Sequence, residues 1–143
     1  MTRPLLLVFL TLLSLGCAQL PPPPEDAAAK RFEAIPDKSV IYLARHALEP
    51  GYVAAVALDD NMIGSTYRGT FMRIEVPAGK HRLRGMAGDS GSIDLVTEAG
   101  KVYFIQHRAH GYRSFVSSSF DQVDAAYGKS LVLGGEITAL ITQ

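Results

Sequence analysis

From Ile35 to the C-terminus, turn-forming residues divide the chain into short apolar runs, and this punctuation restricts the possible folds more than any other feature. The runs are rich in β-branched and aromatic residues, and Gly, Pro, Asp or Asn separates them at intervals of roughly 8–12 residues. Residues 70–76 (TFMRIEV) alternate cleanly, with Thr70, Met72, Ile74 and Val76 on the predicted inner face. The pattern predicts a mainly β domain, a single antiparallel β-sandwich of about 7–8 strands.

The predicted strands cover residues 39–45, 52–58, 61–67, 70–76, 80–87, 92–97, 101–109 and 136–142. Residues 52–58 (YVAAVAL) are apolar on both faces, which predicts a central strand. One short C-terminal helix is expected between Asp121, as its N-cap, and Leu133, because apolar residues recur at four-residue intervals from Val123 to Leu131.

The N-terminus carries a secretory signal that ends at the only cysteine of the chain. Arg3 precedes the uncharged run Leu5–Leu15, and the small Gly16 stands before Cys17, an order typical of a signal peptide. The run has 11 residues, whereas a membrane-spanning helix needs about 20. The stretch Leu13–Cys17 resembles the lipobox of bacterial lipoproteins, which implies that Cys17 is acylated and becomes the first residue after cleavage. An ordinary secretory signal with a free cysteine is the alternative.

Two or three acyl chains on Cys17 would hold the protein in a membrane essentially permanently. Ala18, rather than Asp, follows the cysteine, and by analogy with enteric sorting this predicts the outer membrane, with the protein facing the periplasm or the cell surface. Residues 1–16 are then the signal peptide and residues 17–35 a lipidated N-terminus with a Pro-rich linker, in which Pro21–Pro24 favours a stiff extended spacer. Residues 36–143 form the β domain.

The composition restricts the classes of function. Removal of residues 1–16 from the 143-residue chain leaves 127 residues, enough for one domain with its own core. Arg3 leaves with the signal, so 13 Lys and Arg face 14 Asp and Glu. This balance gives no electrostatic case for nucleic acid. Once Cys17 is acylated, no thiol remains for a disulfide, a cysteine metal site or a cysteine nucleophile.

The middle of the chain resembles the DUF2846 family of predicted bacterial lipoproteins in the order and spacing of four segments, Val40–Arg45, Asp60–Gly64, Val76–Leu83 and Ala99–Ile105. The hairpin segment Val76–Leu83 is also similar to β-sandwich repeats of the PEGA type. Ala44 and His46 depart from the family pattern. The resemblance implies a compact β-sandwich over roughly residues 36–133, and it brings no activity, ligand or catalytic residue with it.

No catalytic or metal-binding constellation is predicted. The histidines are His46, His81, His107 and His110, and the last two point to opposite faces of a predicted strand, unlike a zinc-ligand pair. The serine clusters 90–92 and 117–119 lack a Gly-x-Ser-x-Gly elbow, and loop chemistry explains them. A turn explains Asp59-Asp60, and a helix N-terminus explains Asp121 and Asp124, better than a glycosidase acid pair does. We therefore expect no cofactor and no metal.

A basic and aromatic set forms the candidate binding surface: Arg82, Arg84, Tyr103, Arg108, Tyr112 and Arg113. If strands 80–87 and 101–109 share a sheet, these residues would bind an envelope protein, a wall polymer or an anionic headgroup. Solvated cations that protect strand edges are the alternative. We expect a non-enzymatic, membrane-anchored envelope lipoprotein that acts as a binding module. A small-ligand or metal carrier is the alternative, and an envelope hydrolase is less favoured.

Overall fold

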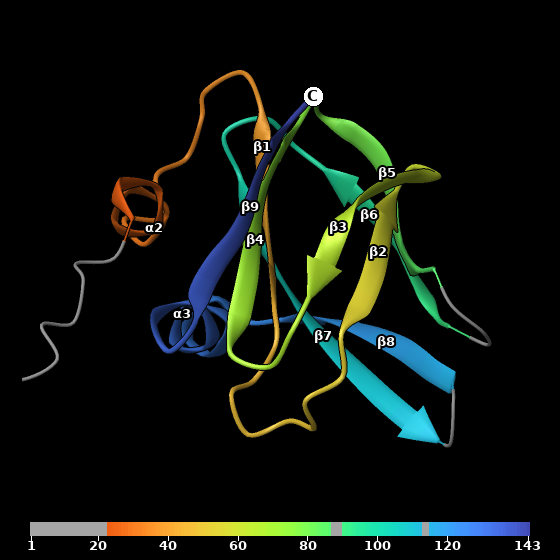
Figure 1. Cartoon of the computed structure of the whole chain (residues 1–143). Helices are drawn as coiled ribbons and strands as arrows, with labels where there is room; N and C mark the ends of the chain where they lie inside the picture. The colour runs from red at the N-terminus through yellow and green to blue at the C-terminus, as the bar shows by residue number, and fades with distance from the viewer. Residues whose placement is uncertain (1–22, 87–89, 113–114) are drawn as a thin grey trace, which may run out of the picture.

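The computed structural model describes residues 23–86, 90–112 and 115–143, which form two packed β-sheets and two short helices (Figure 1). The elements are α2 (Pro24–Ala29), β1 (Ser39–Ala44), β2 (Ala54–Leu58), β3 (Asn61–Thr66), β4 (Thr70–Val76), β5 (Gly79–Gly85), β6 (Ser92–Thr97), β7 (Val102–Tyr112), β8 (Phe115–Val123), α3 (Ala125–Leu133) and β9 (Glu136–Thr142). The predicted mainly β architecture of two sheets with one short C-terminal helix is confirmed. The described residues contain nine strands.

The five-stranded sheet, in the order β8-β7-β1-β4-β9, is covered on both faces. One face packs against the other sheet through apolar residues that include Ile41, Leu43, Met72, Ile74, Val76 and Ile105. The opposite face packs against α2 and α3 through Val40, Tyr42, Phe71, Phe104, Leu131 and Val132. Every residue of β1, the middle strand, is therefore buried. This sheet is the centre of a three-layer arrangement.

The four-stranded sheet, in the order β3-β2-β5-β6, is covered on one face only among the described residues (Figure 1). Its inner side chains, Val56, Leu58, Leu83 and Leu95, complete the core between the sheets. The strand predicted to be central, β2, lies between β3 and β5 as expected. On the outer face Met62 and Val96 are 63% and 72% exposed. Within residues 23–86, 90–112 and 115–143, no further layer packs on this outer face.

Two pairings in the five-stranded sheet are parallel, whereas a wholly antiparallel sandwich was predicted. β1 pairs with β7, and β4 pairs with β9, in parallel. Parallel neighbours need a crossover rather than a tight turn. The chain visits the four-stranded sheet between β1 and β7, and α3 carries it from β8 at one edge of the five-stranded sheet to β9 at the other. Turn signals between consecutive strands predict hairpins, and they contain no information about these long-range neighbours.

The C-terminal helix is shorter than predicted, because a strand occupies the residues before it. β8 extends through Val123, and Asp124 rather than Asp121 is the N-cap, with its carboxylate accepting the Tyr127 amide at 2.9 Å. The serines 117–119 accordingly lie in β8, paired with β7, and not in a loop. Their polarity hides the strand, since a run of serines shows no alternation of apolar and polar residues.

The short helix α2 lies within the range predicted as linker and packs against the five-stranded sheet. The buried carboxylate of Asp26 accepts the amide of Ile137 in β9 at 2.9 Å and forms an ion pair with Lys30 at 2.7 Å. The Tyr42 hydroxyl donates to the Ala29 carbonyl at 2.6 Å. A six-residue helix is not stable alone in water. These tertiary contacts therefore order it and cover part of the edge strand β9.

Gly128 allows α3 to lie directly against the sheet, and this gives a test of the packing. A Cβ atom at this position would lie 2.3 Å from Phe104 Cβ. We expect Gly128→Ala to destabilise the fold by about 1–3 kcal/mol through overpacking, although alanine gains up to ~1 kcal/mol in helix propensity. Guanidinium unfolding followed by circular dichroism measures the change. The control is Ala126→Gly, at an exposed position of α3, because it changes the helix propensity without changing the packing against the sheet. An increase in stability for Gly128→Ala would contradict this packing.

Candidate functional site

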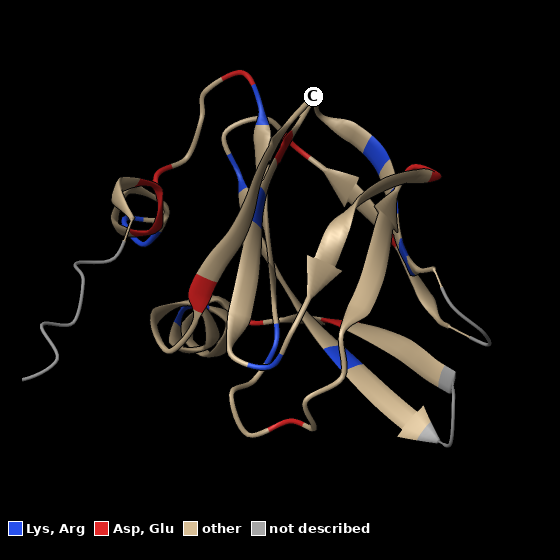
Figure 2. Ribbon diagram, in the orientation of Figure 1, with Lys and Arg blue, Asp and Glu red and all other residues tan. Residues whose placement is uncertain are grey.

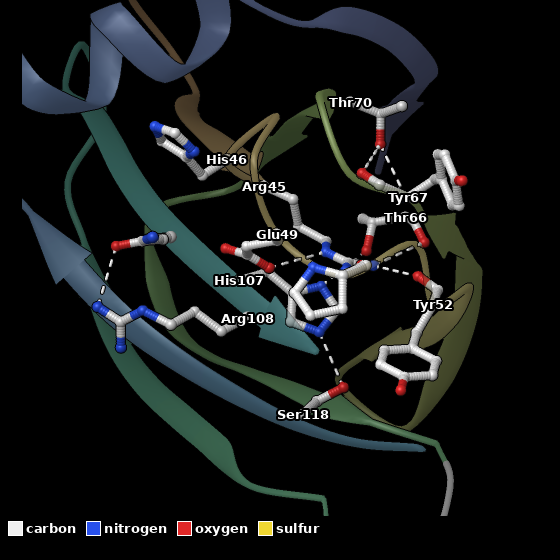
Figure 3. A network of polar contacts seen from close by, with 12 residues as sticks. Arg45, His46, Glu49, Tyr52, Thr66, Tyr67, Thr70, His107, Arg108 and Ser118 are labelled. Carbon is white, nitrogen blue, oxygen red and sulfur yellow. Dashed lines mark hydrogen bonds and ion pairs between the residues drawn. The ribbon is translucent and has the colours of Figure 1, made fainter. Parts of the chain in front are cut away.

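A buried arginine fixes the connection between the two sheets (Figure 3). Arg45 follows β1 and is 0% exposed. Its Nε lies 3.2 Å from a Glu49 carboxylate oxygen, and its Nη2 donates to the Pro50 carbonyl at 3.0 Å. Nη1 donates to the Tyr52 carbonyl and, at 3.3 Å, to the Thr66 carbonyl. Burial of a charge costs several kcal/mol unless it is paired and hydrogen-bonded. The loop between β1 and β2 is folded around this cation to satisfy it.

His107 lies next to this cluster and joins the two sheets (Figure 3). It belongs to β7 of the five-stranded sheet, and its Nδ1 lies 2.8 Å from the hydroxyl of Thr66 in the four-stranded sheet. Its Nε2 lies 2.8 Å from the Ser118 hydroxyl, and its ring stacks on Phe120 at a centroid distance of 4.5 Å. Burial, then the positive charge of Arg45, lowers the pKa of His107 to about 3. The imidazole is therefore neutral at physiological pH, with one ring nitrogen donating and the other accepting.

The pairing of Ser118 with His107 is the contact closest to a nucleophile and base in the described residues. A hydroxyl, that of Thr66, takes the place where a hydrolase has a carboxylate. An imidazole with a pKa of about 3 is a weak base at neutral pH. Ser118 is also only 6% exposed. This geometry favours a structural role, in which the two hydroxyls satisfy a buried ring.

A hollow of about 570 Å³ lies on the outer side of the four-stranded sheet and is lined mostly by charged residues. Its lining residues are Asp59, Asp60, Lys80, His81, Arg82, Asp94, Leu95 and Val96. Figure 2 shows basic and acidic positions alternating over these strands rather than gathering by sign. Arg82 holds Asp94 across the strands through two bonds, of 2.5 and 3.0 Å. Arg84 lies 3.2 Å from Asp60. We call this region the charged hollow.

Asp59 and His81 fix the rim of the charged hollow. Asp59 and Asp60 form the two-residue turn between β2 and β3, both with positive φ angles, 48° and 67°. The Asp59 carboxylate accepts the Arg82 amide at 2.7 Å and contacts His81 Nδ1 at 2.7 Å. Burial alone would raise the pKa of Asp59, but the hydrogen bonds from His81 and Arg82 outweigh it and lower that pKa. His81 Nε2 also lies 2.8 Å from the Pro77 carbonyl, so both ring nitrogens face oxygen acceptors.

The structure separates the residues of the predicted basic and aromatic surface. Arg82 and Arg84 lie in β5 of the four-stranded sheet, whereas Tyr103 and Arg108 lie in β7 of the five-stranded sheet. The Tyr103 hydroxyl accepts the Glu98 amide at 3.0 Å. The other predicted members, the Tyr112 side chain and Arg113, lie outside the described residues, as does Cys17. The two sheets share a core but not a surface, so Arg82 and Arg84 form a site with acidic partners instead.

The four histidines are dispersed. His107 is buried and His110 is exposed, which confirms that they point to opposite faces of one strand. His81 faces the charged hollow. Within the part of the chain that the structure describes, no three His, Cys, Asp or Glu residues are placed to hold a metal ion.

Comparison with protein-family models, curated proteins and solved structures found no match to this chain. Its resemblance to the DUF2846 lipoproteins therefore stays a prediction.

The buried cluster predicts a large effect of removing Arg45. In Arg45→Met, the Glu49 carboxylate and three carbonyl groups lose their donor, and we expect a loss of about 3–5 kcal/mol in the free energy of unfolding. Arg84→Met removes an exposed pair and should cost at most ~1 kcal/mol. Guanidinium titration of both variants gives the comparison. Equal losses would contradict the assignment, and Arg45→Met combined with Glu49→Gln should recover part of the loss.

The low pKa of His107 predicts a specific loss of stability in acid. The unfolded imidazole binds a proton below pH ~6.5, whereas the folded one stays neutral down to about 3. The contribution of His107 to the free energy of unfolding is therefore fully present above pH ~6.5. It falls by about 1.4 kcal/mol per pH unit as the pH decreases from ~6.5 towards 3. Urea midpoints of the wild type and of His107→Gln at several pH values measure the difference. Both proteins have the same carboxylates, so any difference between their pH profiles comes from His107. Parallel profiles would show that His107 does not cause the loss of stability in acid.

Proposed function

We propose that this protein is a non-enzymatic lipoprotein of the bacterial envelope that binds another envelope component through the outer face of its four-stranded sheet. It is attached through acyl chains on Cys17, at the outer membrane. The single observation that carries the proposal is the asymmetry of the two sheets. In the part of the chain that the structure describes, one sheet is covered on both faces, while the other has an uncovered face with the charged hollow.

The surface chemistry supports recognition of a polar macromolecule. The cations and acids of the charged hollow hold each other in place, as in Arg82 with Asp94, so their polar groups are already ordered before binding. Lys80 and Val96 stand opposite each other in the strand pair β5–β6, and both are exposed. A partner gains apolar contact at Val96 and charge complementarity around it. Complementary charge gives specificity more than affinity, which suits an interaction module.

The internal arrangement gives less support to the alternatives. A carrier of a small ligand between the sheets needs a cavity there, but apolar side chains such as Leu43, Val56 and Leu83 fill that space. A hydrolase needs an accessible nucleophile, and Ser118 is buried beside a weakly basic imidazole. No described helix has the length and apolar character of a membrane-spanning segment.

Site-specific photo-crosslinking in intact cells tests the proposal. A photoreactive residue in place of Val96 should give a discrete crosslinked product, whereas the same residue in place of Lys129 on α3 should not. Lys129 is the matched control because it is also exposed but lies on the other side of the five-stranded sheet. The Cys17→Ser variant should move to the soluble fraction and lose this product. Products at Lys129 alone, or a wild-type protein that fractionates as soluble with a free thiol, would refute the proposal.

A further inference from the structure

Exposed apolar side chains gather at one end of the domain, on the connections β1–β2 and β3–β4. Of the ten exposed large apolar residues among those described, four lie there, Leu48 at 89%, Val53 at 63%, Tyr67 at 38% and Tyr52 at 37% exposure. Both connections lie at the same end of the sheets (Figure 1). They also touch, since a Cβ on Gly51 would lie 2.7 Å from the Tyr67 hydroxyl. We call residues 46–53 and 67–69 the loop end.

The loop end is held in one conformation by the buried cluster beneath it (Figure 3). Arg45 donates to the carbonyls of Pro50 and Tyr52 in the first loop and to that of Thr66 at the start of the second. Exposed loops normally lose conformational freedom when they bind, which costs free energy. Here that freedom is already lost in the free protein. The apolar side chains are therefore presented on a preorganised surface.

The residue types of the loop end suit a lipid headgroup region. Its only acid, Glu49, is half-buried and paired with Arg45. Its exposed cation, Arg68, lies over the Tyr67 ring at 5.6 Å from the centroid. Tyrosine partitions to the interface between headgroups and acyl chains, and arginine is attracted to anionic lipid. Leu48 adds an aliphatic side chain that gains free energy by leaving water.

The helix α2, which leads to the anchor, contacts the start of β9, and this end of β9 adjoins the loop end. Asp26 of α2 accepts the amide of Ile137, and the neighbouring Glu136 donates its amide to the Gly69 carbonyl at 3.0 Å. Ala47 lies next to Gly69, with 3.4 Å between its Cβ and the Cβ position of the glycine. Two hydrogen bonds through the start of β9 thus connect α2 to Gly69 of the loop end.

The chain between Cys17 and Pro24 is short. Its seven residue steps span at most about 25 Å when fully extended. An acylated Cys17 therefore keeps Pro24, the first residue of α2, within that distance of the bilayer surface.

We propose that the loop end docks on the lipid headgroup surface of the membrane that holds the acylated Cys17. This inference rests on the proposed function, because it needs the anchor. Docking fixes the domain at a second point and restricts its rotation about the tether. It also leaves the outer face of the four-stranded sheet free of lipid.

Single tryptophans test the docking, because the chain contains none. Leu48→Trp and, separately, Val53→Trp are introduced into the acylated protein, which is reconstituted in vesicles of phosphatidylethanolamine and phosphatidylglycerol. We expect the tryptophan of each vesicle-bound variant to emit at a shorter wavelength than the same tryptophan in the non-acylated Cys17→Ser protein in detergent-free buffer. Brominated acyl chains should quench this emission. The matched control is Val96→Trp, because Val96 is 72% exposed and lies on β6, away from the loop end. This variant should show neither change.

The outcomes separate the two proposals. Mass spectrometry of the reconstituted protein reports the acyl chains on Cys17 directly, and their absence refutes the anchor and the docking together. If Cys17 is acylated but both loop-end tryptophans stay as accessible to water as the Val96→Trp control, only the docking is refuted. Burial of the loop-end tryptophans in native membranes but not in lipid vesicles also refutes lipid docking, and assigns this surface to a membrane protein.

Discussion

The structure depends on a polar cluster that closes one end of the sandwich, where apolar packing alone would leave the strand connections free. Arg45 leaves the five-stranded sheet and bonds the carbonyl of Thr66 in the other sheet, while the Thr66 hydroxyl bonds His107 of the first. A single threonine thus links both buried groups across the sheets. Replacement of one partner leaves the others unsatisfied in a medium of low polarity, so the cluster is stable only as a whole. Its geometry fixes how the two sheets are oriented.

The unequal cover of the two sheets follows from the chain path. The helices α2 and α3 lie on the five-stranded sheet because the strands next to them in the chain belong to it: α2 precedes β1, and α3 joins β8 to β9. The four-stranded sheet contains β2, β3, β5 and β6, and between β3 and β5 the chain returns to the five-stranded sheet to form β4. Within the residues that the structure describes, no helix follows these strands to cover the outer face of their sheet. Charged residues on that face are stabilised by pairing with each other, as in Arg84 with Asp60, instead of by burial. Exposure of this face is therefore a consequence of topology.

Much of the fold was predictable because local signals agreed with the final structure. Thr70–Val76 alternates in sequence, and three of its four predicted inner residues, Met72, Ile74 and Val76, do lie between the sheets. The strand β8 escaped prediction because the burial of Ser118 depends on contacts with His107 and with residues 90–91, which are distant in sequence and leave no local pattern. The burial of Arg45 was equally difficult to predict from the sequence. A charged residue at the end of an apolar strand normally indicates solvent. Its burial becomes possible only when the loop that follows folds back, so that Glu49 and the carbonyl groups of Pro50 and Tyr52 surround the cation.

The candidate site was less predictable than the fold, for a related reason. Grouping cations by type placed Arg82 and Arg108 on one surface, but surface position depends on which sheet a strand joins, and their strands join different ones. Charge pairing then determines the character of each surface. Arg82 is held by Asp94 from the next strand, and Arg108 by Asp121 at 2.6 Å. A basic patch exists only where cations lack such partners, so the neighbours of each arginine, rather than the number of arginines, decide what the surface recognises. On the outer face of the four-stranded sheet those neighbours are acids, which favours a partner that carries both signs of charge over a purely anionic polymer.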